Sequence, residues 1–144
     1  MYVLKGKILR GGGVGRTIGY PTANLDRRFF NGHPVPDGVW VCKIKVRSRK
    51  HAPYRKREFS GAGPKVESRD SWLRGVAVIG MKDEKRGGKK VEVHILDFKK
   101  NIYGWRLEAV LGKYLRKLEK FASVSSLVGQ VRWDIANTRK VVLE

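Results

Sequence analysis

The sequence predicts a mainly β domain, either an antiparallel sandwich or a closed barrel, with one helix at the C-terminal end. Short segments that alternate apolar and polar residues recur along most of the chain. Turn signals containing glycine and proline separate these segments at regular spacing, which is typical of antiparallel sheets and not of alternating βαβ units. Only the last part of the chain changes to the period of a helix.

Five segments are expected to form strands: residues 2–9, 38–46, 75–80, 90–98 and 106–114. The third is a continuous apolar run, short enough for a buried strand, and the other four alternate. The second follows a turn signal of two prolines, an aspartate and a glycine. In the fourth, we expect Glu92, His94 and Leu96 to share the face opposite the valines and isoleucine.

The C-terminal helix is predicted from a single apolar stripe. The residues fall three or four positions apart: Val124, Leu127, Val128, Val131 and Ile135. Ser123 is a suitable N-cap, because its hydroxyl can accept a backbone N–H of the first turn. We expect this helix to lie across the barrel.

Size and charge limit the possible classes. With 144 residues, one domain over 1–144 is expected. The 32 Lys and Arg against 13 Asp and Glu give a formal net charge of +19, which predicts affinity for polyanions. The single cysteine, Cys42, excludes an internal disulfide, and its apolar neighbours predict a buried side chain. No segment approaches the roughly 20 apolar residues of a membrane span, and no signal-peptide pattern is visible, so we expect a cytoplasmic protein.

A basic segment at about 47–73 interrupts the strand pattern. It can be a solvated loop or hairpin inserted between two strands. It can also be a polyanion-binding arm, with His51, Tyr54 and Phe59 interleaved for stacking.

The strongest local signal is the glycine-rich run 11–25. It is neither a Walker A motif, being one residue short with Arg for Lys, nor a dinucleotide-binding fingerprint, because a proline follows where a helix should begin. Behind that proline, Thr22 and Asn24 are two residues apart, so in an extended segment they point to the same side. A hydroxyl and an amide carbonyl beside a phosphate loop suit Mg²⁺, which keeps waters and substrate phosphates as its other ligands.

The motif Gly-x-Gly-Arg-x-x-Gly-Tyr-Pro-Thr-Ala-Asn-Leu at 13–25 is followed, in order, by further characteristic segments at 36–40, 91–98, 102–104, 114–116, 119–123 and 127–134. Together they resemble the signature of riboflavin kinases (flavokinases) over roughly 1–46 and 74–139. The resemblance implies a six-stranded antiparallel Greek-key β-barrel with a C-terminal helix. It also implies Mg²⁺-dependent transfer of the γ-phosphoryl of ATP to the 5′-hydroxyl of riboflavin, giving FMN and ADP.

The resemblance also implies roles for individual residues. Glu92 would be the catalytic base, and Thr22 and Asn24 would serve the metal and the nucleotide phosphates. The other nucleotide-binding positions would be Gly13, Gly15, Arg16, Gly19 and His94. Arg116 and Phe121 would lie on the flavin side. The chain departs from the family in a short charged connection at 81–90, in Leu118 and in the basic insertion.

We further expect a stand-alone kinase module without the adenylyltransferase domain, no tightly bound prosthetic group, no membrane association and a monomer. Nonspecific nucleic-acid binding through the basic surface is also expected. Two alternatives remain at this point. One is a non-catalytic basic barrel that binds RNA or DNA through 47–65, and the other is a sensor that binds flavin or nucleotide without turnover. The presence of Glu92 argues against the sensor, which needs no base.

Overall fold

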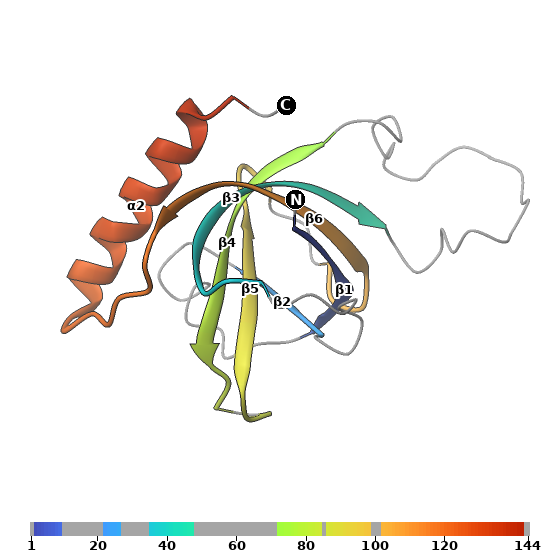
Figure 1. Ribbon diagram of the computed structural model, residues 1–144, viewed down its shortest axis with the longest axis horizontal. Helices are drawn as coiled ribbons and strands as arrows, with labels where there is room; N and C mark the ends of the chain where they lie inside the picture. The colour runs from blue at the N-terminus through green and yellow to red at the C-terminus, as the bar shows by residue number, and fades with distance from the viewer. Residues whose placement is uncertain are drawn as a thin grey trace, which may run out of the picture.

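The computed structural model describes residues 2–9, 22–26, 35–47, 72–84, 86–98 and 102–142. Within them, six strands close into an antiparallel barrel and one helix follows the last strand (Figure 1). The elements are β1 (Val3–Leu9), β2 (Ala23–Leu25), β3 (Gly38–Arg47), β4 (Leu73–Lys82), β5 (Lys89–Ile95), β6 (Arg106–Arg116) and α2 (Val124–Lys140). The predicted mainly β class, the closed barrel and the C-terminal helix are confirmed.

The strands follow the order β1-β2-β5-β4-β3-β6 around the barrel, and β6 pairs back to β1. The neighbours β2 and β5, like β3 and β6, are not consecutive in the chain, so the connections cross over as in a Greek key. The strand β2 is absent from the sequence prediction, because three residues are too few to show an alternating pattern.

Alternate side chains of every strand fill the barrel interior. The strand residues of this core are Leu4, Ile8, Ala23, Leu25, Cys42, Ile44, Ala77, Ile79, Val91, Val93, Ile95, Leu107, Ala109 and Leu111. Cys42 is 0% exposed, as predicted, and burial raises the pKa of its thiol. The prediction that Leu96 continues the face of Glu92 is wrong: β5 ends at Ile95, and Leu96 is buried in the turn that follows.

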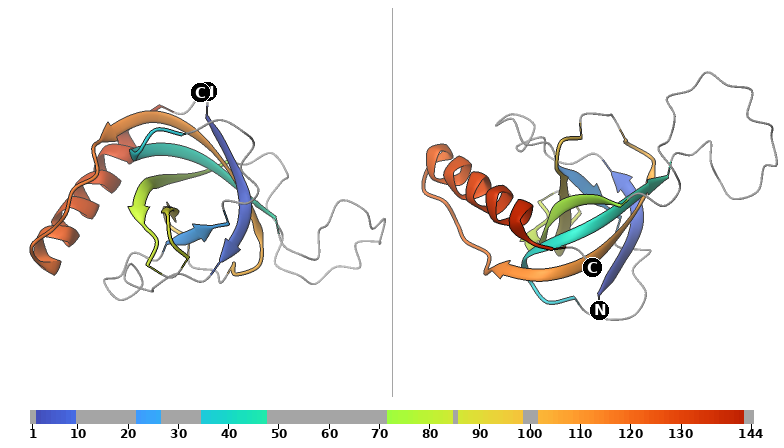
Figure 2. Two further views of the ribbon diagram at one scale, coloured as in Figure 1. Left: turned by 60° about the horizontal axis from the view of Figure 1, so that its bottom comes forward. Right: turned by 90° about the horizontal axis from the view of Figure 1, so that it is seen from above.

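A second apolar layer lies outside the barrel. Strand alternation points Val39, Val41 and Val76 away from the interior, yet each is at most 3% exposed. The helix α2 packs against β4, and Figure 2 shows it running beside the barrel from the curved end of β6. The part of the outer face formed by Val39, Val41 and Val76 is therefore buried, unlike the outer face of an isolated barrel.

Polar groups anchor α2 more deeply than its apolar stripe does. The buried residues of the helix are Asp134 and Thr138, whereas Val124, the first residue of the predicted stripe, is 65% exposed. From β4, Arg74 donates to the carbonyl oxygens of Thr138 and Val141, both at 2.6 Å, and so fixes the C-terminal end of the helix on the barrel.

The predicted N-cap is confirmed. The Ser123 hydroxyl accepts the backbone N–H of Ser126 at 3.1 Å. At the other end, the helix continues five residues beyond the predicted stripe, to Lys140. Arg139 and Lys140 lie in its last turn, where positive charge interacts favourably with the helix dipole.

Apart from its ends, the basic segment between β3 and β4 lies outside the described residues. The prediction of one domain over 1–144 with an inserted loop or hairpin therefore stays a prediction. The described part of the chain contains no helix with the length and apolar character needed to cross a membrane.

Candidate active site on the outer face of the barrel

The pairing of β2 with β5 brings two of the predicted site residues together. Asn24 and Glu92 are register partners, so their side chains leave the same face of the sheet with Cβ atoms about 5 Å apart. Ala23, Leu25, Val91 and Val93 point into the core, which leaves Asn24 and Glu92 on the outer face. Both are half-buried.

The same face continues in both directions along these strands. Thr22 precedes Asn24 by two residues and Asp26 follows it by two, while Lys90 and His94 flank Glu92 in the same way. The β1–β2 pairing extends beyond β2, because the Asp26 N–H donates to the Lys7 carbonyl at 2.9 Å. We call these six residues the polar strip: Thr22, Asn24, Asp26, Lys90, Glu92 and His94.

An ion pair defines the electrostatics of the strip. The Lys90 ammonium donates to Glu92 Oε1 at 2.8 Å, with side chains 31% and 22% exposed. This partial burial strengthens the attraction relative to bulk water. The carboxylate is therefore held on the outer face beside a cation, which is a suitable place to bring an anionic phosphate near a base.

The oxygen atoms of the polar strip decide whether the implied magnesium ion fits this site. Among the described residues, no group of three His, Cys, Asp or Glu could hold a metal ion. The strip offers instead the amide oxygen of Asn24, which is the register partner of Glu92, and the hydroxyl of Thr22 two residues before it. Magnesium bound with a nucleotide needs only one or two protein oxygens in addition to phosphates and water, so these residues fit it.

The strip is connected to Arg116 through one row of paired residues. Glu92 pairs with Val78, Val78 with Val39, and Val39 with Arg116. Three strand-to-strand steps of about 4.8 Å separate Glu92 from Arg116 by about 14 Å along the sheet. The predicted base and the predicted flavin side therefore lie on one face, apart from each other.

Arg116 is held by the helix. Its Nε and Nη2 donate to the two carboxylate oxygens of Asp134 at 2.8 Å each, and the two side chains are only 15% and 5% exposed. Gln130 adds a third donor to Asp134 at 3.2 Å. The guanidinium also lies 5.9 Å from the ring centre of Phe121, so the two predicted flavin residues are neighbours.

At the other end of α2, Arg139 forms a bidentate pair with Asp97, at 2.8 and 2.9 Å. The hydrogen bond from Arg139 lowers the pKa of the Asp97 carboxyl. Asp97 follows β5 with a positive φ of 56°, a conformation that aspartate tolerates better than most residues. This contact ties the helix to the strand that carries Glu92 and His94.

The structure thus brings Thr22, Asn24, Glu92 and His94 onto one face, and Arg116 and Phe121 beside each other. The predicted phosphate-loop residues Gly13, Gly15, Arg16 and Gly19 lie outside the described residues. Sequence reasoning missed Asp26 and Lys90, although alternation from Asn24 and Glu92 could have found both. It gave no separate role to Asp134, although this residue ends the characteristic segment 127–134.

A family model described as flavokinase, riboflavin kinase, matches residues 1–142. The chain is 30% identical over 140 residues to the bifunctional riboflavin kinase/FMN adenylyltransferase of Escherichia coli (strain K12), which covers 96% of this chain. Among solved structures, it resembles riboflavin kinase from Trypanosoma brucei (25% identity, TM-score 0.57), over 95% of this chain and 76% of that one. It also resembles a Streptococcus pneumoniae protein described as a macrolide-efflux protein (28% identity, TM-score 0.72), over 97% of this chain and 39% of that one.

The chain spans only 37% of the length of the curated E. coli relative. The family model nevertheless covers almost all of the sequence, from the first strand to the end of α2. This chain therefore belongs to the riboflavin kinase (flavokinase) family.

Proposed function

We propose that the protein transfers the γ-phosphoryl group of ATP to the 5′-hydroxyl of riboflavin, giving FMN and ADP, with the polar strip as the phosphoryl-transfer site. The observation that supports this proposal is the register pairing of Asn24 with Glu92, which sets an amide beside a carboxylate on one face of the sheet. Membership of the flavokinase family favours this reaction over a non-catalytic barrel.

Phosphoryl transfer requires positioning and charge stabilisation more than covalent chemistry. Glu92 is proposed to orient the attacking 5′-hydroxyl and accept its proton. Lys90, at 2.8 Å from Glu92, can contact the negatively charged oxygens of the transferred group. Thr22 and Asn24 are proposed to hold Mg²⁺ and the phosphates, and the ion when bound neutralises charge on the β- and γ-oxygens.

The separation of Glu92 from Arg116 supports the proposed flavin side. The ribityl chain of riboflavin lies between its 5′-hydroxyl and its ring system, so a base and a ring-binding group should lie apart on one face, as these two residues do. Because the guanidinium is engaged by Asp134, we propose that Arg116 fixes the position of Phe121 and that the Phe121 ring contacts the flavin.

The test is to incubate the purified protein with riboflavin, ATP and Mg²⁺ and to measure FMN by chromatography. The Glu92→Gln variant should lose about 10²-fold or more of kcat, the usual contribution of a general base. The matched control is Glu84→Gln, because Glu84 is an exposed glutamate in the turn between β4 and β5. It removes the same charge and should keep wild-type turnover.

Three outcomes are informative. Loss in Glu92→Gln alone supports the reaction and the base. Equal FMN formation by both variants would retain the kinase and reject Glu92. No FMN with any nucleoside triphosphate would reject the proposed function.

The donor, the metal and the oligomeric state need separate measurements. We propose ATP as donor and a divalent cation as an essential component, so a chelator should stop turnover and added Mg²⁺ should restore it. We also propose a monomer, because the polar strip and the Arg116 cluster are built within one chain. Light scattering after size exclusion tests this.

A further inference from the structure

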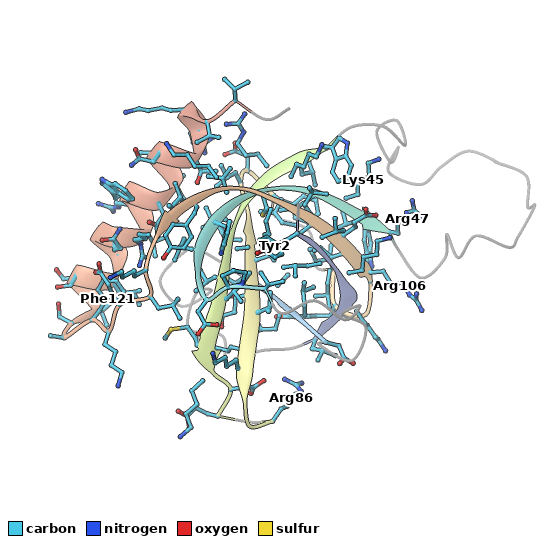
Figure 3. The ribbon with its side chains drawn as sticks, viewed as in Figure 1. Tyr2, Lys45, Arg47, Arg86, Arg106 and Phe121 are labelled. Atoms are coloured by element: carbon cyan, nitrogen blue, oxygen red, sulfur yellow. The ribbon has the colours of Figure 1, made fainter. Side chains whose placement is uncertain are left out.

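The outer faces of three adjacent strands, β1, β6 and β3, carry a concentration of cations. We define the basic face as Lys5, Lys7, Lys45, Arg47 and Arg106. Their positions alternate with the core residues of the same strands, so all five lie outside the barrel. In Figure 3, Lys45, Arg47 and Arg106 gather on the side of the barrel opposite to α2 and Phe121.

The strand register lines these side chains up in rows. Lys7 pairs with Arg106 and Arg106 pairs with Arg47, which makes a row of three like charges directly opposite one another. In the next row, Lys5 and Lys45 flank one carboxylate, Glu108. Like charges in cross-strand pairs destabilise a sheet, so the repulsion within the first row does not help the barrel to fold.

The rows surround a hollow of about 190 Å³, lined by the five cations, by Gly6, Leu107 and Glu108. It is smaller than the roughly 300–1,000 Å³ of typical small-molecule sites. A hollow of this size suits a single phosphate group of a longer ligand better than a whole cofactor.

An aromatic side chain adjoins the cations. The Nζ of Lys45 lies 4.1 Å and that of Lys43 4.8 Å from the ring centre of Trp72, the half-buried residue that precedes β4. Cations that follow a phosphate backbone, with an aromatic ring at one side for stacking, are the combination used by proteins that bind single strands without sequence preference.

We propose that the basic face binds the phosphate backbone of single-stranded nucleic acid. The arginines offer forked donors for phosphate oxygens, the lysines add charge, and Trp72 supplies a surface for an unpaired base. In the order of the barrel, β2 alone lies between β1, which carries Lys5 and Lys7, and β5, which carries Glu92, so the basic face borders the polar strip without including it. The proposed nucleic-acid binding is additional to the proposed kinase reaction, and the KM for ATP distinguishes the two. The residues it uses all lie in the part of the chain that the structure describes, and it needs no residue of 48–71.

The probe is a fluorescein-labelled oligouridylate of about 20 nucleotides, followed by fluorescence anisotropy from about 50 to about 200 mM salt. The face variant carries Lys7→Gln, Arg47→Gln and Arg106→Gln. The control variant carries Lys82→Gln, Arg86→Gln and Lys140→Gln, three exposed cations outside the basic face, and loses the same net charge. Figure 3 shows Arg86 far from the labelled residues of the basic face.

We expect the face variant to bind on the order of 10- to 100-fold more weakly at low salt, and its plot of log K against log salt to be shallower by about 2, since each lost phosphate contact removes about 0.7. The control should stay within about threefold of wild type. Because the variant relieves like-charge pairs, it should melt at or above the wild-type temperature, which excludes unfolding as the cause.

Four results would overturn the proposal. Equal weakening of both variants would mean that net charge alone binds the strand. Tighter binding of a duplex of the same length would assign the face to double strands. Binding confined to vesicles with anionic lipid would assign it to a membrane surface. A raised KM for ATP in the face variant, with unchanged oligouridylate binding, would assign it to the kinase substrate.

Discussion

The Arg116–Asp134 pair provides the sharpest test of how α2 is held on the barrel. The perturbation is to remove one partner at a time, with Arg116→Met and Asp134→Leu, and then both together. The pair joins the end of β6 to the middle of α2 through two 2.8 Å hydrogen bonds.

The magnitude follows from burial. With the side chains 15% and 5% exposed, either single change leaves a largely desolvated charge without its main partner. Such losses cost about 3–5 kcal/mol, and the residual exposure of Arg116 favours the lower end, about 3 kcal/mol. For a chain of this size, that lowers the melting temperature by about 6–12 °C. The double variant, with two apolar side chains, should lose less stability than either single variant.

The assay combines chemical denaturation with hydrogen exchange of backbone amides. If α2 detaches before the barrel unfolds, exchange in the single variants should rise in α2 while the β3 and β4 amides stay protected. FMN formation should fall in the same single variants, because the segment that carries Phe121 loses its fixed position when α2 detaches.

The reasoning is refuted if both single variants lose less than about 1 kcal/mol, the range of exposed ion pairs. It is refuted equally if the double variant is as unstable as the two single losses added together, since the charges would then act independently.

Four further substitutions have defined outcomes. Gly75→Ala should destabilise the barrel by about 1–3 kcal/mol, because a Cβ at this position would meet the His94 carbonyl oxygen at 2.5 Å. Gly129→Ala should stabilise α2 by up to about 1 kcal/mol, because a Cβ there meets no other atom within 4 Å. Thermal melts check both. Asp97→Asn should lower the free energy of unfolding at neutral pH, because the hydrogen bond from Arg139 lowers the folded pKa of this carboxyl. That stabilisation is present above the unfolded pKa and is lost as pH falls through the lowered folded pKa. Denaturation at neutral pH and across the acid range checks this, and a difference that persists once the carboxyl is protonated would contradict it. Lys90→Met should lower kcat/KM for FMN formation by about 10- to 100-fold, since a charge-assisted contact is worth about 1.5–3 kcal/mol. The melting temperature should change little, because the partly exposed Lys90–Glu92 pair adds little stability. An unchanged kcat/KM would remove Lys90 from the proposed site.

Alternation predicted four strands, because each has one face in the barrel interior, and a continuous apolar run predicted the strand at 75–80. Alternation failed for β2, because this strand is only three residues long and has no periodic signal of its own. It is held by its pairing with β1 and β5. The helix was predicted from apolar spacing, yet Asp134 and Thr138 dock deepest. Their arginine partners come from β6 and β4, and no local pattern indicates such partners.

The candidate site was predictable in its residues but not in its geometry. The motif around Thr22 and Asn24 and the segment around Glu92 were recognisable as sequence. That Asn24 lies beside Glu92 depends on the pairing of β2 with β5, two strands far apart in the chain. Which strands pair, and in what register, is a property of the closed barrel, since a slip of one residue would turn every side chain to the other face.

The same register that assembles the polar strip also concentrates the cations. A net charge of +19 predicts affinity for polyanions without saying where they bind. The β1–β6–β3 pairing places Lys7, Arg106 and Arg47 in one row, although these residues come from three separate segments of the sequence. Replacing Arg106 alone with Gln relieves its cross-strand repulsion with Lys7 and Arg47, about 0.2–1 kcal/mol for each pair, and also removes the other interaction that Arg106 makes. The free energy of unfolding should therefore not fall by more than about 1 kcal/mol, while nucleic-acid binding weakens. Stability and binding that change in opposite directions at one residue would identify the row as a binding surface, whereas a parallel loss of both would show that Arg106 stabilises the barrel.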